Sequence, residues 1–163
     1  MEFPSVRPAD DVEQVLNQYG DQIYRICLVT LKNEADAEDA VQETLIRYMQ
    51  KRPRFDNATH EKAWLIRVAV NLCRDMLRKR RYHEEETDCI AAPEENEQYR
   101  AILDALLTLP EPFRVPVTLH YVEGYSVAEL ADILGKTQSA IKMRLSKGRQ
   151  LLREAYGKEQ NHG

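Results

Sequence analysis

The chain has 163 residues, of which 43% are hydrophobic and 31% charged, and it carries a net charge of −4. This length allows one domain or two small ones, and the negative charge argues against a protein that binds nucleic acid over its whole surface. No apolar run approaches the roughly 20 residues of a membrane span, and the first residues, MEFPSVRPADD, lack the pattern of a secretory signal. We therefore expect a cytoplasmic protein with no integral membrane segment.

Apolar residues recur at helical spacing through most of the chain and no apolar–polar alternation is sustained, so we expect an all-α protein. The segment from Val12 to Cys27 predicts either one long helix or two helices that break at Gly20. A second helix is predicted from Asp36 to Gln50, with Pro53 ending it. Asp36 lies in its first turn, where negative charge suits the helix dipole.

This second helix is unusually acidic on one side. Its first part, DAEDAVQETL, has an apolar stripe made by Ala37, Ala40, Val41, Thr44 and Leu45. The polar side includes Asp36, Asp39, Gln42 and Glu43. A solvated outer face is the ordinary interpretation, and a docking face for a basic partner is the alternative.

The next segment, PRFDNATH, predicts a loop in which Asn57 or Thr59 caps the following helix. That helix is predicted from about Glu61 to Arg81 because apolar pairs recur every four residues. These pairs are Trp64-Leu65, Val68-Ala69, Leu72-Cys73 and Met76-Leu77.

The polar face of this helix has the composition of a nucleic-acid contact. It carries Arg67, Asn71, Arg74 and Arg78. An asparagine can read a base edge while arginines hold phosphates, and the loop residues Phe55, Asp56 and Asn57 can hold an unstacked base. Core packing is the alternative interpretation for Phe55, and for Trp64 it is the one we favour.

Residues 83–96, HEEETDCIAAPEEN, predict a flexible acidic linker, because they contain Pro93 and show no periodicity. The linker separates two small helical domains, residues 1–82 and 97–163. In the second domain helical spacing runs from Tyr99 to Pro110, and a short helix follows from about Phe113 to Val122. Pro116 is expected to kink that short helix or to delay its start.

The last part of the chain predicts a helix-turn-helix. Ser126 and Glu129 have the spacing of a capping box, and Gly135 is a suitable stop for the helix they open. A longer helix then runs to about Tyr156, with an inner face made by Ile141, Leu145, Gly148 and Leu152. A helix, a tight turn with glycine and a longer basic helix form a DNA-binding motif.

Six basic residues and no acidic ones lie between residues 136 and 153. The residues predicted to contact DNA are Gln138, Ser139, Lys142, Arg144, Lys147 and Arg149. Arginine and lysine can contact phosphate or guanine, and glutamine can contact adenine. A solvated basic face on an ordinary helical hairpin is the alternative.

The cysteines and histidines give no sign of catalysis. Cys27, Cys73 and Cys89 lack metal-ligand spacing and the four histidines are scattered. We therefore expect reduced thiols, no metal site, no cofactor and no enzymatic activity.

Three segments together resemble a known family. DAEDAVQETL, AWLIRVAVNLCRDMLRKRR and LPEPFRVPVTLHYVEGYSVAELADILGKTQSAIKMRLSKGRQLLR resemble, in this order, the signatures of extracytoplasmic-function (ECF) sigma factors of the sigma-70 family. The resemblance runs from about Val12 to Arg153. It implies a sigma-2 domain that binds RNA polymerase and that opens and reads the minus-ten element, and a sigma-4 domain that reads the minus-thirty-five element.

The resemblance also implies partners and assigns the residue sets. The acidic face, Asp36, Asp39, Gln42 and Glu43, is expected to dock on the β′ clamp helices of core RNA polymerase, and the second domain on the β flap. The minus-ten set is Phe55, Asp56, Asn57, Arg67, Asn71, Arg74 and Arg78, and the helix-turn-helix residues form the minus-thirty-five set. Promoter DNA and an anti-sigma factor are the other expected partners, and the acidic linker either threads into the polymerase channel or serves as a plain tether.

Three features depart from the family pattern. Pro116 stands where the family pattern has an aliphatic residue, which is the second reason to expect a kinked or late-starting helix there. The loop PRFDNATH is short and has one aromatic residue, which favours capture of a single flipped base. The recognition helix starts with TQSAIKMR, so the family's base preference does not carry over. Two other functions stay open: a dimeric helix-turn-helix repressor, and a sigma mimic that binds an anti-sigma factor but never DNA.

Overall fold

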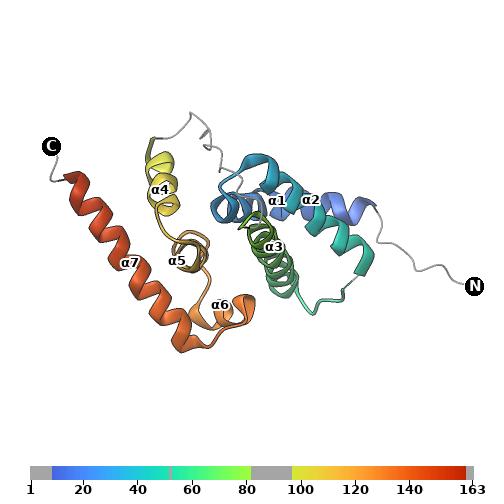
Figure 1. Cartoon of the computed structure of the whole chain (residues 1–163). Helices are drawn as coiled ribbons and strands as arrows, with labels where there is room; N and C mark the ends of the chain where they lie inside the picture. The colour runs from blue at the N-terminus through green and yellow to red at the C-terminus, as the bar shows by residue number, and fades with distance from the viewer. Residues whose placement is uncertain (1–8, 52, 82–96, 161–163) are drawn as a thin grey trace, which may run out of the picture. The chain divides into compact units, whose positions relative to one another are not determined.

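The computed structural model describes residues 9–51, 53–81 and 97–160, and all regular secondary structure within these ranges is helical. The chain divides into two compact units, residues 1–87 and 88–163, whose helices are labelled in Figure 1. The all-α prediction is confirmed. The predicted linker, residues 83–96, lies outside the described residues, so its flexibility and its path stay predictions.

The first unit is a bundle of three helices, α1 (Ala9–Leu31), α2 (Glu34–Lys51) and α3 (Ala58–Arg81), in which each helix packs against the other two. The segment of α1 forms one long helix, and Gly20 does not break it. The core of the unit includes Ile23, Ile26, Ala37, Ala40, Tyr48, Leu65 and Ala69.

α2 begins two residues before the predicted start because Asn33 caps it. The Asn33 Oδ1 atom accepts a hydrogen bond from the backbone N–H of Asp36 at 2.9 Å, which satisfies one of the N–H groups that a helix start leaves without a partner. Lys32 adopts a left-handed conformation, with φ of 56°, and turns the chain from α1 into α2.

The buried face of α3 is wider than its four-residue repeat predicts. Ile66 and Val70 are buried along with Leu65 and Ala69, whereas Trp64 and Val68 are only half-buried. The reason is that α3 packs against both α1 and α2, so a single stripe does not describe its contacts.

Two of the three cysteines lie in this core. Cys27 on α1 and Cys73 on α3 are free and buried. A hydrogen bond with Cys27 and burial both raise the pKa of the Cys73 thiol, and a protonated buried thiol is unreactive. The expectation of free thiols is confirmed for these two residues, and Cys89 lies outside the described residues.

The second unit contains α4 (Glu97–Leu107), α5 (Glu111–Val117), the π-helix η1 (Thr118–Val122), α6 (Val127–Leu134) and α7 (Gln138–Gln160). α7 packs against α4, α5 and α6 (Figure 1). Gly148 allows the close approach of α7 to α5, because a Cβ atom at this position would lie 2.5 Å from Cγ2 of Val117.

Pro116 lies inside α5 and is buried. The helix starts at Glu111, so the expectation of a delayed start is wrong. Proline has no N–H for the carbonyl of Pro112, four residues earlier, and the backbone changes from α-helix to π-helix at Thr118. Such wide turns mark places where the regular hydrogen-bond ladder is interrupted.

Candidate protein- and nucleic-acid-binding surfaces

The acidic face predicted on α2 is present on its outer side. Asp39, Gln42 and Glu43 are exposed, and the opposite side buries Ala37, Ala40, Thr44 and Tyr48. Oε1 of Glu43 lies 3.7 Å from Nε of Arg47, and both side chains are well exposed, so this pair contributes little to stability. The face is therefore a solvent-accessible acidic surface.

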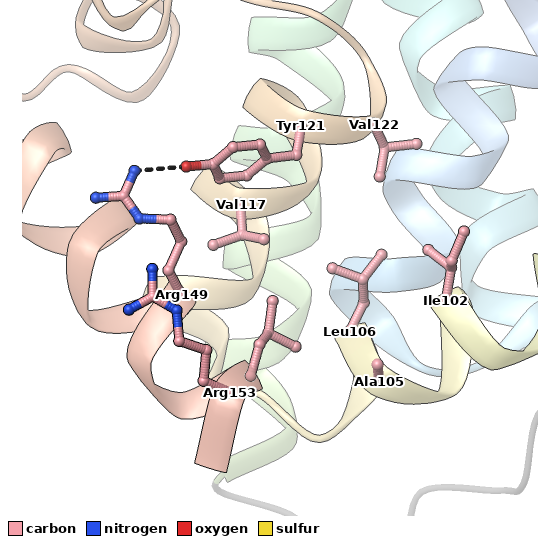
Figure 2. A pocket seen from close by; sticks show the side chains of 9 residues that line it. Ile102, Ala105, Leu106, Val117, Tyr121, Val122, Arg149 and Arg153 are labelled. Carbon is pink, nitrogen blue, oxygen red and sulfur yellow. Dashed lines mark hydrogen bonds between the residues drawn. The ribbon is translucent and has the colours of Figure 1, made fainter. Parts of the chain in front are cut away.

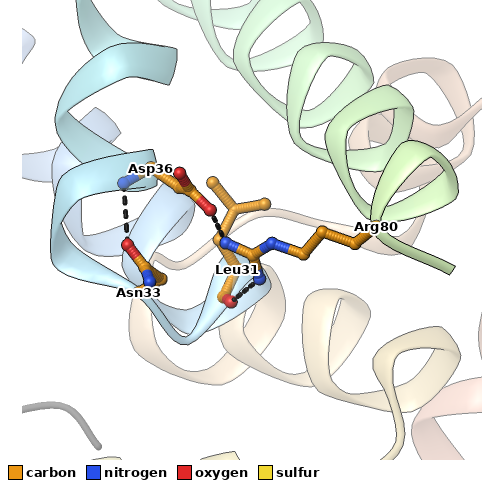
Figure 3. Close-up of polar contacts among 4 residues, drawn as sticks. All are labelled: Leu31, Asn33, Asp36 and Arg80. Atoms are coloured by element: carbon orange, nitrogen blue, oxygen red, sulfur yellow. Dashed lines mark hydrogen bonds and ion pairs between the residues drawn. The ribbon is translucent and has the colours of Figure 1, made fainter. Parts of the chain in front are cut away.

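Asp36 differs from the other three residues of that set because it is half-buried and pairs with a residue of another helix (Figure 3). Its Oδ2 atom forms an ion pair with Nη2 of Arg80 on α3, and the Arg80 side chain is only 14% exposed. Nη1 of Arg80 also donates a hydrogen bond to the backbone carbonyl of Leu31 at 2.8 Å. Arg80 thus joins the end of α3 to the end of α1 and the start of α2, a role that the sequence analysis missed.

A partly apolar groove borders the acidic face. It lies between α1 and α2 and is lined by Leu16, Asn17, Gly20, Asp21, Tyr24, Glu38, Val41, Gln42 and Leu45. Leu16 is 44% exposed, and Val41 and Leu45 are the part of the α2 apolar stripe that is not fully buried. Burial, followed by the nearby carboxylates of Glu34 and Glu38, raises the pKa of Tyr24.

The loop before α3 rests on a cluster of aromatic rings. Phe55 stacks on Tyr48 with a centroid separation of 6.4 Å and meets the edges of His60 and Trp64 at 5.8 and 5.9 Å. Tyr48 is buried and donates a hydrogen bond from its hydroxyl to Oε2 of Glu61 at 2.9 Å. Phe55 is half-buried, so it packs within the protein and also shows part of its ring to solvent.

A shallow hollow lies beside this cluster. It is lined by Pro53, Arg54, Phe55, Asn57, Ala58 and Glu61. Asp56 and Asn57 are exposed, and Oδ1 of Asn57 accepts a hydrogen bond from the backbone N–H of His60 at 2.9 Å. Of the two predicted caps, Asn57 is therefore the one that α3 uses.

The polar face of α3 follows the hollow along the helix. Arg67, Asn71 and Arg78 are exposed and Arg74 is half-buried. Their spacing of four, three and four residues places them on one side of the helix. Arg78 pairs with Asp75 in the same helix, and both side chains are more than half exposed, so the guanidinium stays accessible to other partners.

The helix-turn-helix is confirmed in α6 and α7. Ser126 and Glu129 form the predicted capping box, with both hydrogen bonds at 3.1 Å. Gly135 ends α6 in the left-handed conformation, with φ of 64°. Thr137 caps α7, because its Oγ1 accepts a hydrogen bond from the N–H of Ala140 at 3.1 Å.

The six residues predicted to contact DNA do not share one environment. Gln138, Ser139, Lys142 and Lys147 are exposed, whereas Arg144 is half-buried. Arg149 donates a hydrogen bond from Nη1 to the hydroxyl of Tyr121 on η1 at 2.6 Å. Figure 2 shows that this bond points Arg149 toward a groove on the unit.

This second groove is apolar and has a volume of about 350 Å³. Its lining residues are Ile102, Ala105, Leu106, Val117, Tyr121, Val122, Arg149, Leu152 and Arg153 (Figure 2). Ile102 and Tyr121 are each 49% exposed. An apolar floor with arginines at its edge suits an amphipathic protein segment, and the sequence analysis did not identify it.

Within the described ranges, no helix is long and apolar enough to cross a membrane. The same ranges contain no group of three or more histidine, cysteine or carboxylate side chains placed to hold a metal ion.

Both units match known sequence families. Residues 15–82 match Sigma-70 region 2, and residues 99–152 match Sigma-70 region 4. The chain is 33% identical to the ECF RNA polymerase sigma factor SigE of Mycolicibacterium smegmatis over 90% of its length, and it spans 62% of that longer protein. It is 30% identical to the RNA polymerase sigma factor CarQ of Myxococcus xanthus, over 91% of this chain and 90% of CarQ.

A solved structure is similar across both units. The sigma factor RpoE from Bartonella quintana, crystallised in complex with the anti-sigma factor NepR, matches with a TM-score of 0.76 and 26% identity. The match covers 90% of this chain and 96% of that chain.

Proposed function

Because this chain belongs to the extracytoplasmic-function group of the sigma-70 family and is an RNA polymerase sigma factor, we propose that its two units divide promoter recognition between them. The first unit binds core polymerase and the minus-ten element, and the second unit binds the minus-thirty-five element. Residues 83–96 connect the two as a tether. The observation that carries this proposal is that one chain combines an acidic helix face beside a partly apolar groove with two basic helix faces.

In this proposal, core polymerase docks on the outer face of α2. Asp39, Gln42 and Glu43 complement an arginine-rich partner such as the β′ clamp helices, which steers association and fixes orientation. The groove between α1 and α2 supplies the apolar centre that a specific interface needs. Asp36 contributes to this interface indirectly, because its ion pair with Arg80 holds the start of α2 in place.

The loop and the polar face of α3 read the minus-ten element. The hollow beside Phe55 takes one unstacked base, and the partly exposed ring and the Asn57 amide offer stacking and hydrogen bonding. Arg67, Asn71 and Arg74 follow the strand along α3, with phosphate contacts for position and the asparagine for sequence. One aromatic platform supports capture of a single base and not of a stacked series.

The second unit binds two partners on different sides. The outer face of α7 enters the major groove of the minus-thirty-five element, as recognition helices do. The apolar groove lined by Ile102 and Tyr121 receives an apolar segment of the β flap. Since the similar protein RpoE was crystallised with an anti-sigma factor, we also propose that an anti-sigma factor holds this chain inactive by covering its polymerase-binding surfaces.

The proposed mechanism has no chemical step of its own. Polymerase binding places two DNA-reading elements on one particle, and each raises the effective concentration of the other. The net charge of −4 limits binding of the free subunit to random DNA, so promoter binding depends on polymerase. Because polymerase and chromosome lie in the cytoplasm, the protein acts there.

Transcription in vitro tests this proposal. Core polymerase with the purified chain is incubated with a library in which both promoter elements are randomised, and transcripts are sequenced. We expect initiation that depends on the chain and two conserved elements at a fixed separation. No chain-dependent transcript from any promoter overturns the proposal.

The two other functions give different results in the same system. A dimeric repressor selects a palindrome without polymerase and yields no transcripts. A sigma mimic binds neither promoter element, and its anti-sigma binding survives neutralisation of Lys142 and Arg144.

A further inference from the structure

Met143 is the most exposed large apolar side chain among the described residues. Its side chain is 73% exposed, more than Ile102 or Tyr121 in the apolar groove. A single exposed apolar residue is common on protein surfaces and needs no functional explanation by itself. Met143 is of interest because it lies in the first half of α7, the second helix of the helix-turn-helix.

Met143 points away from the core of the unit. It lies between the buried residues Ile141 and Leu145, two positions from each. At 3.6 residues per turn, two positions correspond to a rotation of roughly 200°, so Met143 stands opposite the buried stripe. In a helix-turn-helix this is the side of the second helix that faces the base edges.

The neighbours of Met143 allow close approach to DNA. Ser139 and Ser146, one turn before and one turn after it, are exposed and small. They leave Met143 as the longest apolar side chain on this face, while the exposed cations Lys142 and Lys147 flank it and can reach phosphates. Ser139 and Ser146 are separated by roughly 10 Å along the helix axis, which is about three base-pair steps.

We propose that Met143 is a specificity-determining residue that contacts the C5-methyl group of a thymine in the major groove of the minus-thirty-five element. Thymine presents the one apolar group among the base edges of that groove. Every other base lacks this methyl group: cytosine places only a C5–H there, and a purine presents N7 and a further polar group that the methionine cannot satisfy. The inference rests on the proposed function, since it needs α7 to enter the major groove.

The first test compares base preferences. Wild-type chain and Met143→Ala, each with core polymerase, select initiating promoters from a library with a randomised minus-thirty-five element. Alanine suits a helix, and an exposed side chain contributes little to stability, so the variant folds. We expect the wild type to prefer thymine at one position and the variant to lose that preference there and nowhere else.

The second test removes the methyl group alone. Uracil replaces thymine at the selected position, and open-complex formation is measured at subsaturating holoenzyme. We expect open-complex formation by the wild type to fall about fourfold on uracil, which is the change in affinity that burial of one methyl group gives. Met143→Ala is expected to form open complexes equally well on uracil and on thymine. Met143→Leu keeps an apolar tip and retains most of the thymine preference, whereas Lys142→Ala weakens all sequences alike.

The outcomes separate the inference from the function on which it rests. If initiation occurs but Met143→Ala changes no base preference, or if the wild type treats uracil and thymine alike, the inference is overturned and the sigma function stands. If the wild type gives no polymerase-dependent transcript, the sigma function and the inference fail together.

Discussion

Arg80 and Asp36 form an ion pair that links the last turn of α3 to the first turn of α2. The same guanidinium donates to the carbonyl of Leu31, so one mostly buried side chain stabilises the corner at which all three helices of the first unit meet. The acidic face proposed to bind polymerase starts at this corner, and its orientation depends on the pair.

Substitution of Arg80 tests the strength of this corner. Arg80→Gln removes the ion pair and weakens the bond to Leu31, and we expect the free energy of unfolding of the first unit to fall by about 2 kcal/mol. Native-state hydrogen exchange of the α1–α3 amides measures it. Arg80→Gln with Asp36→Asn is expected to cost less than the sum of the single changes, because the residues are coupled.

Arg78→Gln is the matched control for this experiment. Arg78 is 73% exposed and pairs only one turn away in its own helix, so its loss is expected to cost less than about 0.5 kcal/mol. Equal effects of Arg80→Gln and Arg78→Gln would contradict the structural role of Arg80.

Neutralising the acidic face tests its proposed partner. Asp39→Asn with Glu43→Gln is expected to slow association with core polymerase roughly tenfold at low salt and to reduce the dependence of that rate on salt, because charges at an interface mainly steer encounter. Stopped-flow or surface-plasmon measurements give both quantities. The control variant, Glu13→Gln with Asp104→Asn, changes two exposed acidic residues elsewhere. It should leave the association rate near that of the wild type. Equal slowing by both double variants would argue against a specific acidic face.

Asn57 has a structural role and a proposed DNA-binding role, and two substitutions separate them. Asn57→Ala removes the cap of α3 and is expected to lower the free energy of unfolding of the first unit by about 1 kcal/mol. Asn57→Asp keeps a capping oxygen but places a negative charge in the hollow. We therefore expect Asn57→Asp to be stable yet to form open complexes poorly, as measured by permanganate reactivity of the melted strand. A stable aspartate variant with normal melting would show that Asn57 only caps the helix.

Gly148 controls the contact between α5 and α7. In Gly148→Ala the new methyl group would meet Val117 at 2.5 Å, and overpacking of this kind is expected to cost about 1–3 kcal/mol. Val117→Ala removes the clashing methyl, so the double variant should lose less than the two single variants together. Thermal unfolding followed by circular dichroism measures these differences, and additive losses would show that the backbones move apart freely.

Features set by neighbours along the chain could be predicted from the sequence. The capping box of Ser126 and Glu129 joins residues three positions apart, and the stop at Gly135 bonds to Ala131 four positions earlier, so a short window contains each interaction. For the same reason the sequence narrowed the cap of α3 to Asn57 or Thr59. The apolar repeats predicted the helices themselves for the same reason.

Features set by distant residues could not be predicted in this way. Arg80 had no predicted role and Arg149 was predicted to contact DNA, because their partners, Asp36 and Tyr121, are distant from them in sequence. The two-sided burial of α3 and both grooves depend on which helices become neighbours. The sequence did contain a sign of the first groove. Val41 and Leu45 make the apolar stripe of α2 wider than its packing buries, and both residues are half-buried.

The hydrogen bond between Arg149 and Tyr121 has a practical consequence for genetics. Arg149, Leu152 and Arg153 line the groove from α7, so in the proposed function this one helix contributes both to DNA binding and to binding of the β flap. A substitution at Arg149 can therefore reduce reporter expression by weakening DNA binding or by weakening β-flap binding, and a reporter screen does not distinguish the two. Substitutions at Ile102, which lines the groove, and at Lys147, which lies on the proposed DNA-binding face and not in the groove, separate the two effects.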